Sequence, residues 1–179
     1  KRHADLLGAL RLLKEQGVQG IEAVLVGEGD QRPALEAYAA QHGLDNVHFL
    51  GFQPYSEIGK LCAAADMGVI LSDYDPSPKA LNEMLNFELP ILCTETVGTA
   101  HDLVAHGESG YLVPVGDIPA IAEGIRKVAE DPVLAARMGK KSAEIVSAWS
   151  YEVDVEALVK AVAQASRLRS RLAKENAHA

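Results

Sequence analysis

The sequence predicts an α/β protein with a Rossmann-like parallel sheet that is covered by helices on both faces. Short, continuous apolar runs alternate along the chain with segments whose apolar residues repeat at helical spacing. A strand that is buried on both faces reads as such a continuous run. The 179 residues are 48% hydrophobic and only 5% aromatic. This composition favours layered packing of helices and sheet around one core over a β-sandwich.

Glycines and prolines divide the first half of the chain into helices and strands. Leucines recur at helical spacing from residue 6 to residue 13, and Gly17 and Gly20 close this first helix. Another helix is expected from Pro33 to His42, where Gly43 stops it. Apolar runs that end at a glycine or in a polar loop predict strands at 23–26, 47–50 and 67–71, with a helix over 55–65 between the last two.

The second half continues this alternation. A helix is expected over residues 78–87, followed by an apolar strand at 91–93. Residues 99–105 are expected to be helical, and 111–113 to form the last strand. The remaining helices are marked by Ile118, Ile121, Ile125 and Val128, by a start at Pro132, and by a long segment from about Glu152 to near Lys174.

The domain organisation follows from these elements. Residues 1–150 are interpreted as one Rossmann-like domain, and residues 151–179 as a long C-terminal helix with its tail. The chain does not start with Met, and it opens directly in a helical pattern. Because a crossover helix in a parallel sheet follows a strand, we expect the first strand of the sheet upstream of Lys1, in a longer protein.

Charge and composition argue against several classes of function. The formal net charge of −8 argues against a nucleic-acid footprint. Basic clusters such as 126–127 and 167–171 are interpreted as solvated helix faces, with a membrane-surface role as the alternative. No apolar run approaches the roughly 20 residues of a membrane span. Cys62 and Cys93 lack metal-ligand spacing and are interpreted as buried thiols in a reducing compartment.

Polar loops follow several of the predicted strands. Gly27, Gly51, the loop that contains Asp75, and the segment 94–98 all come directly after apolar runs. In open parallel sheets, ligands bind outside the carboxyl ends of the strands. We therefore expect these loops to gather on one edge and to form a binding site there.

The segment from Asp75 to Glu83 is the strongest candidate within that edge. Ser77 is expected to cap a helix that has Pro78 at its first position. The free amides of such a helix start, with the helix dipole behind them, attract phosphate. Asp75 before the helix and Glu83 within it add two carboxylates, which can accept hydrogen bonds from the hydroxyls of a sugar.

Other familiar sites find less support. Gly27-x-Gly29 resembles the start of a dinucleotide fingerprint, but Arg32 occupies the position where a third small residue is needed. The six histidines show no spacing typical of a metal site. His101 lies at the expected ligand edge, but we interpret it as a surface histidine. No motif of a covalent hydrolase is visible.

A series of motifs follows one order along the chain, from Lys1 to about Val159. They are Val24-Leu-Val-Gly-Glu-Gly29, Asn46-Val-His-Phe-Leu-Gly51, the acids Asp75 and Glu83, Leu89-Pro-Ile-Leu92, Val97-Gly98, and Gly107-Glu-Ser-Gly-Tyr-Leu-Val-Pro114. In these motifs the chain resembles the carboxyl-terminal, nucleotide-sugar-binding half of a retaining glycosyltransferase of GT-B architecture, in group 1 (family four).

The resemblance implies roles for particular residues. Glu83 matches the acid that holds the ribose of a nucleotide sugar, and Asp75 the acid that contacts hydroxyls of the donor sugar, where the family normally has Glu. Lys1 aligns with a phosphate-binding lysine. The resemblance also implies that the diphosphate contacts Ser77, Pro78, Lys79 and Ala80. The base would contact Gly51, Phe52 and Gln53, and Gly27 and Gly98 are further donor contacts.

The resemblance also implies a reaction and its partners. A sugar would move from a nucleotide diphosphate sugar to a glycan or lipid acceptor with retention, in polysaccharide biosynthesis, without a metal or another cofactor. The acceptor would bind to an amino-terminal domain, so the fragment alone would be inactive. A cytoplasmic location is expected, at the inner face of the membrane if the full-length protein makes peripheral contact with it. Half of a sugar-nucleotide epimerase and a non-catalytic nucleotide-sugar-binding or regulatory domain remain alternatives.

Overall fold

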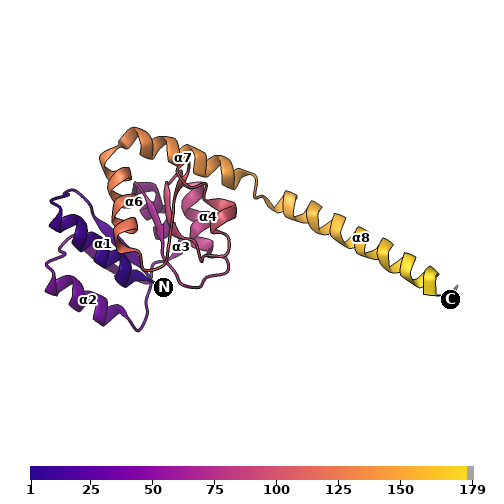
Figure 1. Ribbon diagram of the computed structural model, residues 1–179, viewed down its shortest axis with the longest axis horizontal. Coiled ribbons are helices and arrows are strands. Elements are labelled where there is room, and N and C mark those ends of the chain that lie inside the picture. The colour runs from indigo at the N-terminus through magenta and orange to yellow at the C-terminus, as the bar shows by residue number, and fades with distance from the viewer. Residues whose placement is uncertain (177–179) are drawn as a thin grey trace.

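The computed structural model describes residues 1–176, with side chains to residue 169, and helices alternate with strands along most of its length (Figure 1). The strands are β1 (Ala23–Val26), β2 (Val47–Gly51), β3 (Gly68–Ile70), β4 (Ile91–Thr94) and β5 (Gly110–Val113). The helices are α1 (His3–Glu15), α2 (Arg32–Gln41), α3 (Tyr55–Ala64), α4 (Lys79–Asn86), α5 (Ala100–Leu103), α6 (Ile118–Glu130), α7 (Pro132–Ser147) and α8 (Tyr151–Asn176). Each predicted helix and strand is present; the end of the predicted tail, 177–179, lies outside the described residues.

The strands pair in parallel, as the continuous apolar runs predicted. β1 pairs with β2, and β4 lies between β3 and β5, with Ile91 opposite Gly68 on one side and Gly110 on the other. Among the described residues the two groups share no strand pairing, so β1 and β3 each keep one open edge. The strand that is expected upstream of Lys1 would have both of these open edges available for pairing. Its presence stays a prediction.

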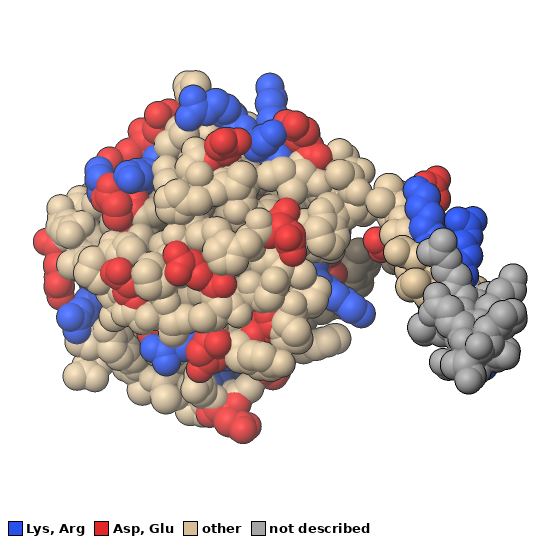
Figure 2. Space-filling view, turned by 45° about the vertical axis from the view of Figure 1, so that its right-hand side comes forward, with Lys and Arg blue, Asp and Glu red and all other residues tan. Residues whose placement is uncertain are grey.

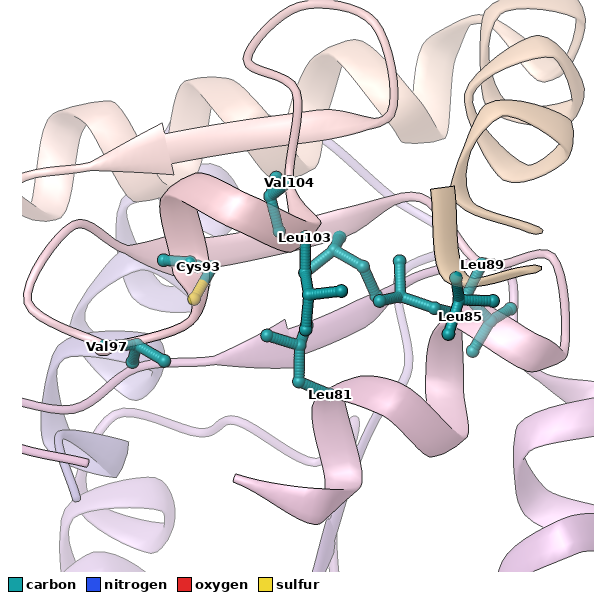
Figure 3. Close-up of a cluster of buried hydrophobic side chains, with 10 residues drawn as sticks. Leu81, Leu85, Leu89, Cys93, Val97, Leu103 and Val104 are labelled. Atoms are coloured by element: carbon teal, nitrogen blue, oxygen red, sulfur yellow. The ribbon is translucent and has the colours of Figure 1, made fainter. Parts of the chain in front are cut away.

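Helices cover both faces of the three-stranded group, as predicted. Successive side chains of a strand point to opposite faces. Ile91 and Cys93 of β4 therefore pack against Leu81 and Leu85 of α4, in a cluster that α5 and α7 complete (Figure 3). Leu92 points the other way, into a cluster with residues of α1 and α6. All four residues of β4 are buried, which makes this strand the centre of the core.

The two-stranded group differs from the prediction of helices on both faces. Half-buried and exposed residues alternate along β1 and β2. Leu25 and Phe49 pack toward α1 and α2, whereas Val24, Val26 and Leu50 remain more than two-fifths exposed. The apolar run of β1 predicted a strand buried on both faces, but in these residues only one of its faces is covered.

The final helix extends away from the rest of the molecule (Figure 1). Every described side chain of α8, from residue 151 to residue 169, is exposed. Within the described part of the chain, no helix is both long enough and apolar enough to cross a membrane. On the face shown in Figure 2, acidic and basic side chains are interspersed over the body. That face has no extended basic patch of the kind that nucleic acid requires.

Two glycines of the helices have contrasting surroundings. Gly139 lies in α7 where the helix crosses the end of α4, and a Cβ added there would overlap the backbone carbonyl of Glu88. Gly59 lies in α3, and a Cβ there would meet only the ring of Phe87, at an ordinary contact distance of 3.6 Å. The glycine at 139 is therefore what lets α7 approach α4 closely.

The same substitution is expected to act in opposite directions at these two positions. Gly139→Ala should lower the free energy of unfolding by about 3 kcal/mol, because the backbone of Glu88 cannot move without displacing α4. Gly59→Ala should raise it by up to about 1 kcal/mol, through the higher helix propensity of alanine. Urea unfolding followed by circular dichroism measures both. Equal effects of the two substitutions would contradict this account of the α4–α7 contact.

Candidate functional site

Lys1 and Asp75 meet at the carboxyl edge of the three-stranded group. The Nζ atom of Lys1 forms an ion pair and hydrogen bond with Oδ2 of Asp75. The side chain of Lys1 is 51% exposed, whereas that of Asp75 is only 14% exposed. The lysine therefore reaches from solvent to a carboxylate that is largely withdrawn from it. The structure thus places Lys1 at the predicted ligand edge.

The start of α1 is anchored beside this ion pair. The backbone N–H of Arg2 donates to the carbonyl oxygen of Leu71, directly after β3, at 2.9 Å. The guanidinium of Arg2 makes two hydrogen bonds to the carboxylate of Asp5, at 2.8 and 3.0 Å, and Asp5 is buried. Because both contacts act on the residue next to Lys1, they fix where its backbone lies. Sequence reasoning did not identify this anchor.

Buried hydroxyls hold the loop that leads from β3 to Asp75. Oγ1 of Thr94 accepts a hydrogen bond from the N–H of Ser72 at 2.9 Å and donates to the carbonyl oxygen of Ser72 at 2.7 Å. Thr96 donates to the same carbonyl at 2.6 Å. Ser72 and Thr94 are completely buried. Sequence reasoning missed this contact too, although hydroxyl residues directly after two apolar runs were a usable signal.

Gly98 brings the next loop against the backbone around Asp75. The N–H of Gly98 donates to the carbonyl oxygen of Asp75 at 2.8 Å, and Val97 forms a parallel bridge with Asp75. A Cβ at Gly98 would overlap the carbonyl of Pro76. Of the predicted site residues, the structure therefore joins Lys1, Asp75 and Gly98 by direct contacts.

The start of α4 differs from its prediction. Ser77 does not cap the helix, and Pro78 is not its first helical residue. Pro78 occupies the cap position, with φ −69° and ψ 119°, and no side chain hydrogen-bonds to the helix start. Pro78 also disfavours helical geometry at Ser77, which precedes it. The amides of Lys79 and Ala80 have no acceptor among the described residues, so the predicted anion-attracting end is present without its cap.

Glu83 lies on α4, between the buried residues Leu81 and Leu85, and is itself half-buried. Burial, and then the charge of Glu83, raise the pKa of the Cys62 thiol on α3. Cys62 is only half-buried, although it was predicted to be buried. Burial, together with the charge of Asp75, raises the pKa of the buried Cys93 to about 12. Each of the two acids therefore lies near a thiol that remains protonated at neutral pH.

Gly27 and Gly51 form a second group, at the carboxyl edge of β1 and β2. The N–H of Gly27 donates to the carbonyl oxygen of Gly51 at 2.7 Å, and both glycines have positive φ angles, 116° and 69°. Arg32, whose size argued against a dinucleotide fingerprint, forms ion pairs at 2.7 Å with Glu28 and with Glu36. Arg32 therefore places a long, ion-paired side chain where the dinucleotide fingerprint needs a small residue.

The predicted base contacts lie after Gly51. The ring of Phe52 is 80% exposed, and the side-chain amide of Gln53 donates to the carbonyl of Leu50 at 2.8 Å. Among the described residues, no hydrogen bond or ion pair joins this group to Lys1 or Asp75; both groups lie at carboxyl ends of parallel strands. Within the described residues, no cluster of His, Cys, Asp and Glu has the arrangement of a metal site.

Comparison with known proteins assigns the family. Residues 1–145 match the family described as "Glycosyl transferases group 1". The chain belongs to this glycosyltransferase family. It is 30% identical over 162 residues to the amylovoran biosynthesis glycosyltransferase AmsK of Erwinia amylovora, a match that covers 84% of this chain and 39% of the relative. The chain thus spans about two-fifths of the length of that relative.

Solved structures show the same fold. The Anabaena protein Alr3699/HepE, in complex with UDP and glucose, aligns with a TM-score of 0.77 and 25% identity, over 91% of this chain and 45% of that one. The C-terminal domain of the group 1 protein LpcC from Francisella tularensis aligns with a TM-score of 0.71 and 24% identity, over 80% of this chain and 76% of that one. The predicted carboxyl-terminal half of a GT-B architecture is confirmed at the level of fold and family.

The buried thiol of Cys93 predicts a pH dependence of stability. Its folded-state pKa of about 12 exceeds its ordinary value of about 9, so the folded state holds the proton more tightly. This contribution is complete below pH ~9 and is lost as the pH rises toward ~12, at up to about 1.4 kcal/mol per pH unit. Urea unfolding between pH 8 and 11 should show a steeper decline for the unsubstituted chain than for Cys93→Ala. Parallel declines would contradict the prediction.

Proposed function

We propose that this chain is the donor-binding domain of a glycosyltransferase that moves a sugar from a nucleotide diphosphate sugar to an acceptor. The observation that carries the proposal is the meeting of Lys1, Asp75 and the uncapped start of α4 at one edge of the sheet, in a chain of this family. Cationic and amide donors lie there beside acids, and a diphosphate joined to polyhydroxyl groups needs that combination.

In this proposal the diphosphate binds at the start of α4. The free amides of Lys79 and Ala80 and the ammonium of Lys1 donate to its oxygens. Lys79 is exposed and has no ion-pair partner among the described residues, so its charge is available to an anion. The hydroxyl of Thr99, next to Gly98, is buried without a hydrogen-bond partner in the described part of the chain. An unsatisfied hydroxyl at this edge supports a ligand there.

The acids and the second loop group would hold the remainder of the donor. Glu83 accepts hydrogen bonds from the ribose, and Asp75 accepts them from the transferred sugar. Gly51, Phe52 and Gln53 contact the base, with the exposed ring of Phe52 as a flat apolar surface. Gly27 keeps the neighbouring loop close to Gly51. The complex of Alr3699/HepE with UDP and glucose supports a donor of this class.

The chemistry proposed is breakage of the sugar–phosphate bond at an edge that stabilises the departing diphosphate. The sugar gains positive charge as the bond lengthens, and the diphosphate gains negative charge. In the donor complex the helix amides and the ammonium of Lys1 face that charge, and each such donor is typically worth about 3 kcal/mol in the transition state. The proposal uses no metal and no protein nucleophile, and it keeps the configuration of the sugar by attack on the same face.

The acceptor would bind to an amino-terminal domain of the longer protein, which acts in the cytoplasm and contacts the inner face of the membrane. The chain alone is expected to bind the donor weakly and to transfer no sugar, because it lacks acceptor contacts. A transfer assay with radiolabelled nucleotide sugar and total polysaccharide and lipid acceptors tests this. Efficient transfer by the 179 residues would contradict it.

Substitution of Glu83 tests the donor site directly. Isothermal titration with UDP-, ADP-, GDP- and dTDP-glucose should identify one preferred donor, and Glu83→Ala should weaken its binding about tenfold to a hundredfold through lost charge-assisted hydrogen bonds. Glu144→Ala removes an exposed acid of α7 and serves as the matched control, with less than a twofold effect. If no donor in the panel binds, or if both variants behave alike, the proposal fails.

A further inference from the structure

We propose that Asp75 favours the intact donor over the nucleoside diphosphate product, by competing with the product for Lys1. This inference rests on the proposed function and adds to it a reason why the product leaves. In the ligand-free protein, the ammonium of Lys1 is paired with the carboxylate of Asp75. Any phosphate that recruits Lys1 must therefore first take it from Asp75.

The two partners differ in how freely they can move. Asp75 is held by its backbone, through the N–H of Gly98 and the bridge with Val97, and its side chain is 14% exposed. Lys1 is 51% exposed and carries its charge on a flexible four-carbon stem. On ligand binding, Lys1 is the partner that moves, and Asp75 remains in place with its carboxylate poorly solvated.

The other cations at this edge do not replace Lys1. Arg2 is committed to the buried carboxylate of Asp5 by two hydrogen bonds. Lys79 is unpaired in the described structure and meets the diphosphate of donor and product alike. Of the cations at this edge, the ammonium of Lys1 is therefore the one whose contribution can differ between donor and product, because it is paired with Asp75.

An intact donor and a released diphosphate present different groups to Asp75. The hydroxyls of the donor sugar can donate to the carboxylate and replace Lys1 as its partner, so that Lys1 turns to the diphosphate. The product has no sugar, and its recruitment of Lys1 leaves a partly buried carboxylate without a partner, which is unfavourable. The ion pair thus weakens product binding without an equal effect on the donor.

The test compares Kd values by isothermal titration for the preferred glucose donor of the panel and for its nucleoside diphosphate, UDP, ADP, GDP or dTDP. Asp75→Asn should bind the diphosphate about threefold to tenfold more tightly, the range expected for a partly exposed ion pair, and should bind the donor no more tightly. Asp73→Asn is the matched control. It removes an exposed acid two residues away that has no ion pair with Lys1, and should change either Kd by less than twofold.

A second variant keeps the test decisive if Asp75→Asn disturbs the loop. Lys1→Met truncates an exposed ammonium and should weaken binding of the donor more than binding of the diphosphate. In the double variant, Asp75→Asn should no longer tighten diphosphate binding. Equal tightening of both ligands, an equal effect of Asp73→Asn, or equal losses in Lys1→Met would overturn the inference while the donor still binds. Absence of binding by any donor would overturn the proposed function instead, and the inference with it.

Discussion

The geometry of the site depends on one buried threonine hydroxyl. The hydrogen-bonded register of β3 and β4 ends at Ile70 and Cys93, and beyond it the two strands lead into different loops. Oγ1 of Thr94 then bonds both the N–H and the carbonyl oxygen of Ser72, so a side chain continues the ladder by one step. Each bond contributes about 1 kcal/mol, but a buried amide left without a partner costs more. This contact fixes where the loop leaves the sheet, and hence where Asp75 lies.

The core explains why this edge can be rigid while another part of the sheet stays open. β4 sends Ile91 and Cys93 to one buried cluster and Leu92 to the other, so both layers of helices are anchored on a single strand. The loops after β3 and β4 leave the sheet from this anchored strand and from the strand paired with it. β1 and β2 are covered on one face, and no strand pairing among the described residues joins them to β3, β4 or β5. Gly27 and Gly51 thus lie on the less constrained half of the described structure.

Residues close together in sequence were predicted well, and contacts between distant residues were not. Apolar runs such as Ala23–Val26 and Ile91–Cys93 predicted their strands from local sequence alone, because short runs of aliphatic and β-branched residues favour extended structure. The cap at Ser77 was wrong because Pro78, although its φ of −69° suits a helix, has an extended ψ of 119°, so the helix begins at Lys79 and the cap position falls on Pro78. Ser72 and Thr94 are 22 residues apart, and Lys1 and Asp75 are 74 apart. No periodicity encodes such pairs, so the sequence predicted Lys1 at the edge but not its partner.

The two acid–base pairs at the start of α1 show why the residue types there are not interchangeable. Arg2 presents a planar, forked guanidinium to Asp5, and two directional hydrogen bonds hold both groups in one arrangement. Lys1 presents to Asp75 a compact charge on a flexible stem. Another anion in a suitable position can therefore also bind this ammonium group. A site that must hold its backbone still while a charge changes partners needs one pair of each kind. With arginine at position 1, a bidentate pair with Asp75 would resist exchange, and with lysine at position 2 the anchor of α1 would loosen.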